Sequence, residues 1–171
     1  SASQRAWLRD GTLDDQLAFW RKAVDNASPD RAMIPGAGKD GSPAHGAVHV
    51  IKRLIPTKQV QKLDQIIDRL GMSRFSFYCG LYTLCMQRLS QLDDINISVI
   101  AADRGHEEFD EVIGCYVNAM FITKHLGSLE TTEAYLKRVH VSAMEMLANQ
   151  DVPQMVINEM FPPSATGTKA L

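Results

Sequence analysis

The residues from Val112 to Ile122 have the most strand-like pattern in the chain. After Gly114, whose missing side chain permits a tight bend, the residues are β-branched, aromatic or apolar, with one amide, Asn118, among them. Because side chains alternate along a strand, one face carries Tyr116, Asn118, Met120 and Ile122 and the other carries Val117, Ala119 and Phe121. Both faces are mostly apolar, so we predict that residues 113–122 form an inner strand of a mixed sheet that helices cover.

Several segments repeat apolar side chains at helical spacing. They are residues 12–25, 57–70, 73–90 and 131–148, followed by a short helix that begins near Pro153. Thr57, Ser73 and Thr131 are the expected N-caps, and Gly71 is the expected C-cap of the second helix. Apolar residues surround nearly the whole circumference of the helix at 73–90, which is typical of a helix at the centre of a core. The fold class that follows is a layered α/β (α+β) sandwich.

The remaining segments alternate between expected loops and strands. Residues 26–46 contain Pro and Gly throughout and are expected to form a long surface loop, and residues 161–171 an irregular tail. Residues 47–55 are rich in β-branched side chains and predict a strand that ends at Pro56. Residues 95–102 predict another strand, and the polar run at 103–108 predicts a loop.

Length and composition restrict the possible classes of protein. A chain of 171 residues that is 45% hydrophobic can bury one substantial core, so residues 1–171 are expected to be one domain or one lobe of a domain. A formal charge of −2 and a pI near 6.2 suggest neither nucleic acid nor an anionic membrane as a partner. Cys79, Cys85 and Cys115 lack C-x-x-C spacing and are expected to be buried free thiols of a cytoplasmic protein.

No catalytic or metal-binding constellation is evident from the residues themselves. His49 has no acid or nucleophile nearby, and His106 lies among loop acids without a second histidine at ligand spacing. We therefore predict no catalytic residue and no metal ligand in this chain. Asn118 is open to two interpretations: a core amide bonded to backbone, or a polar group that lines a channel.

Three segments resemble motifs of one known family, the condensation domains of nonribosomal peptide synthetases. Residues 113–119, Ile-Gly-Cys-Tyr-Val-Asn-Ala, resemble the family's I-G-x-F-V-N-T sequence. Residues 149–153, Asn-Gln-Asp-Val-Pro, resemble its H-Q-D-V-P-F-E sequence, and Leu13 to Trp20 is similar to the segment that leads to a Y-W pair. The middle of the chain, from Ser73 to the Asp103-Arg104 turn, also resembles the family's long buried helix, strand and G-R turn.

The resemblance implies a fold and a function. The family has two lobes of chloramphenicol-acetyltransferase type, and this chain is similar to the C-terminal lobe. The implied reaction joins a carrier-bound acyl or peptidyl thioester to a carrier-bound aminoacyl thioester through an amide bond. The implied partners are the N-terminal lobe, peptidyl carrier proteins with their phosphopantetheine arms, and a neighbouring adenylation domain. No cofactor is expected to bind directly, and Asn118 is the one residue implied to line the tunnel between the lobes.

The sequence also departs from the family pattern. The H-H-x-x-x-D-G signature, whose second histidine is generally placed at the reacting amine, is absent, so the chain alone is expected to be inactive. Ala119 and Gln154 replace a threonine and a phenylalanine, and residues 164–171 stand where R-D-x-S-R-N-P-L is usual. Two alternatives therefore stay open: a non-catalytic interaction or scaffold module of an assembly line, and an acyltransferase of the same architecture that uses coenzyme A.

Overall fold

The computed structural model describes residues 2–25, 50–92, 94–102, 111, 113–114, 117–125 and 130–160. Its elements, in chain order, are α1 (Ala2–Asp10), α2 (Asp14–Asp25), α3 (Thr57–Leu70), α4 (Arg74–Ser90), β1 (Asp94–Ala102), β2 (Val117–His125), α5 (Thr132–Ala148) and α6 (Gln154–Met160). Three expected irregular segments lie outside the described residues: the loops at 26–46 and 103–108 and the tail at 161–171.

The two described strands form one antiparallel sheet. The register pairs Asp94 with His125 and Ala102 with Val117, so Asn118 lies opposite Ala101. Within the described part of the chain the sheet consists of these two strands. The inner position of the strand expected at 113–122 stays a prediction. The strand begins later than expected, since Gly114 lies in a bend and Ile113 is fully exposed.

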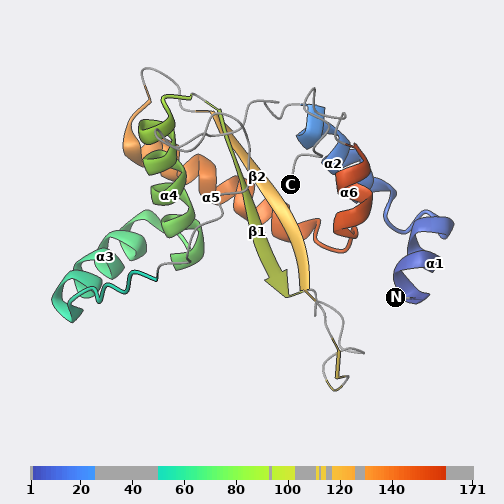
Figure 1. The fold of residues 1–171 in the computed structure, drawn as a ribbon, viewed down its shortest axis with the longest axis horizontal. Coiled ribbons are helices and arrows are strands. Elements are labelled where there is room, and N and C mark those ends of the chain that lie inside the picture. Colours follow the sequence, from blue (N-terminus) through green and yellow to red (C-terminus); the bar gives the residue numbers. More distant parts are fainter. Residues whose placement is uncertain are drawn as a thin grey trace.

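β2 is nevertheless covered on both faces. Met120, Phe121 and Ile122 are consecutive and all buried, although successive side chains of a strand point to opposite faces. One edge of β2 pairs with β1, and α6 contacts β2 on its other side, where a further strand was expected (Figure 1). The apolar pattern therefore predicted the burial of this strand correctly, but a helix provides part of it.

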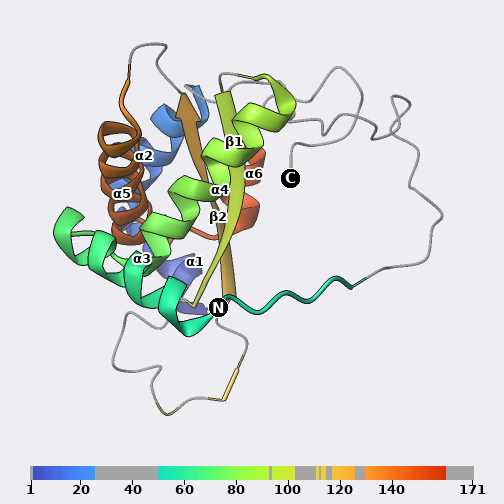
Figure 2. The ribbon, with the colours of Figure 1, turned by 90° about the vertical axis from the view of Figure 1, so that its left-hand side faces the viewer.

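The helices pack around this pair of strands. α5 crosses behind the strands in Figure 1, α4 lies on the side of β1, and the turned view in Figure 2 places α5 and α2 on the same side of the sheet. α4 and α5 pack closely, because Gly80 has no side chain: a Cβ there would lie 2.6 Å from Cδ2 of Leu136. The fold class of helices layered on a β-sheet is confirmed.

Local signals for the helix ends were mostly correct. Ser73 accepts a hydrogen bond from the Ser76 N–H, Thr131 accepts one from the Ala134 N–H, and Gly71 ends α3 with a φ of 65°. Thr57 is an exception, because the helix already includes it and Pro56 precedes the first turn without a side-chain cap. α1 was not predicted.

Three further expectations were wrong. The described part of the expected strand at 47–55, Val50 to Ile55, has no regular structure, and its residues 47–49 lie outside the described residues. α4 is not covered all round: an exposed stripe at spacings of three and four carries Phe75, Tyr78, Tyr82, Cys85 and Leu89. Cys85 is thus an exposed thiol, whereas Cys79 is buried as expected and Cys115 lies outside the described residues.

Candidate functional site: the motif junction

The segment between α5 and α6 has no regular structure of its own. α5 ends at Ala148 and α6 begins at Gln154, so the carbonyl oxygens of residues 149–152 need partners outside a helix or sheet ladder. Val152 is fully buried and the other residues of the segment are partly buried, so water reaches only part of this backbone. Side chains from β2 and α2 supply the partners.

Asn118 of β2 holds the segment through three hydrogen bonds. Its Nδ2 donates to the carbonyl oxygens of Gln150 at 2.7 Å and of Val152 at 2.8 Å. Its Oδ1 accepts from the backbone N–H of Gln154 at 3.0 Å, at the start of α6. An amide is suited to this position because it carries both donors and an acceptor. Both amide hydrogens and the oxygen are thus used by backbone, and the side chain is 6% exposed.

α2 holds the same segment from the other side. The indole Nε1 of Trp20 donates to the carbonyl oxygen of Asn149 at 2.8 Å. Nε2 of Gln16 donates to Oδ2 of Asp151 at 2.7 Å, and Oε1 of Gln16 accepts from the Asp151 N–H at 3.1 Å. Gln16 and Trp20 are four residues apart, so they lie on one face of α2 and reach the segment together.

Apolar contacts surround these hydrogen bonds. Trp20 is fully buried, and its ring lies 5.1 Å from that of Phe121 on β2. Val152 and Ile157 join the same buried cluster. Burial strengthens the hydrogen bonds and makes the loss of any one partner costly. We refer to Gln16, Trp20, Asn118 and residues 149–154 as the motif junction.

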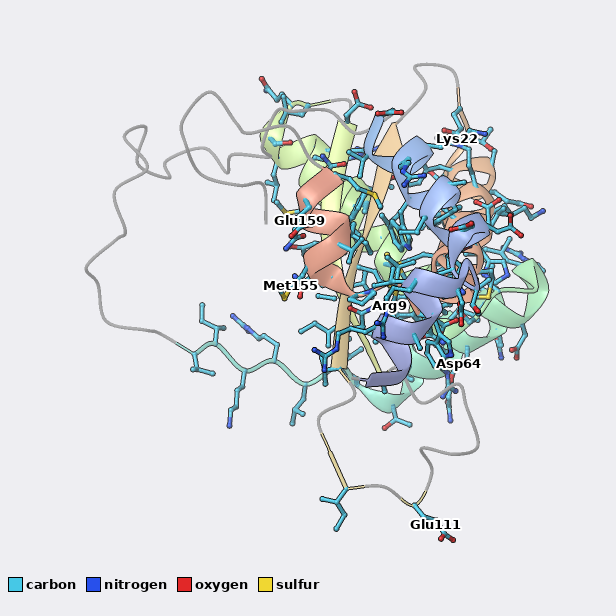
Figure 3. The ribbon with its side chains drawn as sticks, turned by 90° about the vertical axis from the view of Figure 1, so that its right-hand side faces the viewer. Arg9, Lys22, Asp64, Glu111, Met155 and Glu159 are labelled. Atoms are coloured by element: carbon cyan, nitrogen blue, oxygen red, sulfur yellow. The ribbon has the colours of Figure 1, made fainter. Side chains whose placement is uncertain are left out.

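The motif junction brings together the three segments on which the family resemblance was based. In Figure 3, α2 lies on one side of β2 and α6 on the other. The hydrogen bonds of Asn118 match its interpretation as a core amide, and its role as a tunnel-lining residue stays a prediction. Sequence reasoning did not single out Gln16 or Asp151. A signal was present for Gln16, because an amide interrupts the apolar face of Leu13, Leu17 and Trp20.

A second polar network joins α4 to α5. The hydroxyl of Tyr135 donates to Oγ1 of Thr83 at 2.9 Å, and Thr83 in turn donates to the carbonyl oxygens of Cys79 and Gly80. Burial is the main cause that raises the pKa of Tyr135 above its ordinary value. This network fastens two helices together and is not open to a substrate.

A serine and a histidine also lie within hydrogen-bonding distance between these helices. Nδ1 of His140 is 3.0 Å from Oγ of Ser76, and Ser76 Oγ is 2.8 Å from Oγ of Ser73. Ser76 is fully buried, so its hydroxyl cannot attack a substrate from solvent. The pair therefore serves packing at the start of α4.

Neither a metal cluster nor a membrane span is found within the described residues. No group of three His, Cys, Asp or Glu side chains there is placed to hold a metal ion. Among the helices described, each is too short or too polar to cross a bilayer. The contacts shown for the motif junction are hydrogen bonds that hold backbone in place.

Comparisons with known proteins agree with the motifs. The family described as Condensation domain matches residues 2–167. Malpibaldin synthetase of Mortierella alpina is 30% identical over 172 aligned residues, which cover 95% of this chain and 3% of the synthetase. The X-domain from teicoplanin biosynthesis has a TM-score of 0.79 at 20% identity, covering 95% of this chain and 38% of that one.

A further solved structure is similar in fold. The condensation domain of the monacolin K polyketide synthase MokA has a TM-score of 0.76 at 19% identity, covering 92% of this chain and 38% of that one. The chain thus spans well under half of these solved chains and a small part of the curated relative. Since the family match includes nearly every residue, this chain belongs to the condensation domain family of the nonribosomal peptide synthetases.

Proposed function

We propose that residues 1–171 are the C-terminal lobe of a condensation domain that forms amide bonds between carrier-bound thioesters. The observation that carries this proposal is the motif junction, where three segments that resemble family motifs meet through side-chain hydrogen bonds. A coverage of 38% of the solved condensation domain from MokA supports an assignment to one lobe.

In this proposal the lobe positions substrates and does not supply the base. The phosphopantetheine arms of an upstream and a downstream carrier protein enter a tunnel between the two lobes, and this lobe forms one wall and an acceptor-side surface. Holding two tethered thioesters face to face accounts for much of the rate, since it replaces an encounter in solution by a local one. The histidines of the H-H-x-x-x-D-G sequence belong to the N-terminal lobe, and an adenylation domain loads the downstream carrier.

Within the wall, we assign Asn118 a positioning role. Its three bonds to the backbone of residues 150–154 hold the start of α6 against β2. A tunnel lined by this part of the lobe would keep its shape only while these bonds persist. Direct contact between Asn118 and a phosphopantetheine arm stays a prediction, which an Asn118→Ala variant of the intact domain tests through its turnover and its stability.

The experiment that tests the function compares the 171-residue chain with the intact condensation domain that contains it. Both are mixed with a loaded donor carrier and a loaded acceptor carrier, and the acceptor carrier is analysed by mass spectrometry. The intact domain is expected to transfer the acyl group, and the chain alone is expected to give no product because it lacks the base.

Two outcomes would contradict the proposal. Product formed by the chain alone would overturn the lobe assignment and the role of the absent histidines. An intact domain that is folded and binds both carriers, yet gives no product with any loaded pair, would favour the non-catalytic scaffold module instead. The matched control is the Ser98→Ala variant of the intact domain, which changes an exposed position on β1 and should form product as the unmodified domain does.

A further inference from the structure

The stretch from Val50 to Ile55 exposes apolar side chains without regular structure. Val50 is 74% exposed, Ile51 83%, Leu54 98% and Ile55 54%. In Figure 3 this teal stretch runs outward before α3, and its side chains project away from the helices and strands. Contiguous exposed apolar residues on a globular protein usually mark a surface that another segment covers.

The composition of this stretch is that of a strand. Val, Ile and Leu occupy four of its six positions, and β-branched residues favour extended backbone in a sheet. Within the described part of the chain, however, no backbone hydrogen bond joins residues 50–55 to another strand. Among the described residues, this apolar stretch of strand-forming composition therefore has no neighbour that uses its N–H and C=O groups.

The charges at the centre of the stretch argue against a second copy of this chain as that neighbour. If two copies paired antiparallel over residues 50–55, Lys52 of each would lie opposite Arg53 of the other. In-register parallel pairing would place each cation beside its own equivalent. Like charges directly opposite one another destabilise a strand pair, so a strand with neutral or acidic residues at these positions fits better.

We infer that residues 50–55 form a β-strand with a strand supplied by the remainder of the condensation domain. This inference rests on the proposed function, because it requires that the chain is part of a larger domain. The solved condensation domain from MokA has the necessary length, since this chain matches 38% of it. The partner strand carries apolar residues on both faces and no cation opposite Lys52 and Arg53. Strand addition of this kind uses main-chain hydrogen bonds for affinity and side chains for register.

Hydrogen exchange followed by mass spectrometry tests the pairing. In the 171-residue chain the amides of residues 51–55 are expected to exchange as in an unstructured peptide. In the intact condensation domain the exchange of alternate amides in this stretch is expected to slow by about tenfold or more, because a strand with one neighbour bonds every second N–H to it. The amides of α3 are the internal control, since they are protected in both proteins.

A pair of proline variants gives a second measurement. Proline removes one N–H but accepts extended backbone, so Lys52→Pro and Arg53→Pro should leave the melting temperature of the chain alone unchanged. In the intact domain one of the two should lower the melting temperature clearly more than the other, because adjacent residues point their N–H groups in opposite directions. Lys52→Ala and Arg53→Ala, which keep the N–H, are the matched controls.

The outcomes separate this inference from the proposed function. The strand pairing would be overturned if the amides of residues 51–55 exchanged equally fast in the 171-residue chain and in the intact domain. If that intact domain also formed product, the proposed function would stand. Protection that appears in the chain alone and increases with its concentration would overturn it in favour of a second copy. Protection in an intact domain that forms no product would support the pairing and count against the function.

Discussion

The Asn118→Ala substitution tests whether the motif junction stabilises the fold. It removes three hydrogen bonds, of 2.7, 2.8 and 3.0 Å, and leaves two carbonyl oxygens and one N–H without their partner. With a net contribution of about 1 kcal/mol for each bond, the free energy of unfolding should fall by about 3 kcal/mol. That is a large fraction of the roughly 5–15 kcal/mol that holds a typical domain together.

Urea denaturation of the 171-residue chain measures this loss. Trp20 is fully buried and bonded to the Asn149 carbonyl, so its fluorescence reports on the motif junction directly. A Trp7→Phe background leaves Trp20 as the one indole of the sequence. For a urea dependence of about 1–3 kcal/mol per molar, a loss of about 3 kcal/mol lowers the midpoint by on the order of 1–3 M.

The control and the contradicting result follow from the same structure. Ser98→Ala removes a hydroxyl from an exposed position of the neighbouring strand and should change stability by less than about 0.5 kcal/mol. If Asn118→Ala were equally mild and the intact domain lost turnover, the core role would be refuted and the tunnel-lining role favoured. A loss of about 3 kcal/mol with normal turnover per folded molecule would remove Asn118 from the tunnel.

Three further predictions concern other contacts. Gln16→Glu should lower the melting temperature at pH 7 more than Gln16→Ala does, because its carboxylate would face the Asp151 carboxylate across the present 2.7 Å contact. Equal melting temperatures of the two variants would contradict this. Gly80→Val should lower the free energy of unfolding, measured by chemical denaturation, by about 1–3 kcal/mol, since its Cβ would lie 2.6 Å from Leu136 Cδ2. An unchanged free energy of unfolding would show that α4 and α5 can move apart to accept the side chain. Burial raises the pKa of Tyr135, so the folded chain keeps the phenol protonated at a pH where the unfolded chain ionises near its ordinary pKa of about 10. The free energy of unfolding should therefore fall as pH rises above about 10, and it should fall less in Tyr135→Phe than in wild type.

The helices could be predicted because their signals are local. The spacing of apolar residues and the caps at Ser73 and Thr131 act within a few residues, so they operate whatever the rest of the fold does. α1 was missed because residues 2–10 carry only two large apolar side chains, Trp7 and Leu8. A helix held by so few contacts has almost no periodic signal.

Strand pairing was harder to predict, because a strand is defined by its neighbour. The residues 50–55 have strand composition, yet their local sequence does not say which strand they join. The same reasoning applies to α4, whose apolar circumference indicated burial but not which molecule or segment would cover Phe75, Tyr78 and Tyr82. Hydrophobicity measures a preference to be covered and carries no information on the covering partner.

The site was predicted in part. Asn118 was identified because a lone amide in an apolar strand needs an explanation. Its partners were beyond sequence reasoning, since they are backbone atoms 32 to 36 residues away, and any residue type supplies such atoms. The pairing of Gln16 with the Asp151 side chain was hidden because the two residues are 135 positions apart, although the amide within an apolar helix face was visible.

The contacts of α2 have a consequence for the order of folding. Trp20 and Gln16 bind residues that follow them by 129 and 135 positions. At a synthesis rate of about 5–20 residues per second, the ribosome needs on the order of 10 s to deliver those partners after α2 has emerged. During that time the indole lacks the carbonyl oxygen that accepts its hydrogen bond, and closing so long a loop slows folding further. A chaperone that shields short apolar helices should therefore bind nascent chains that end before Asn149 and release those that extend past α6.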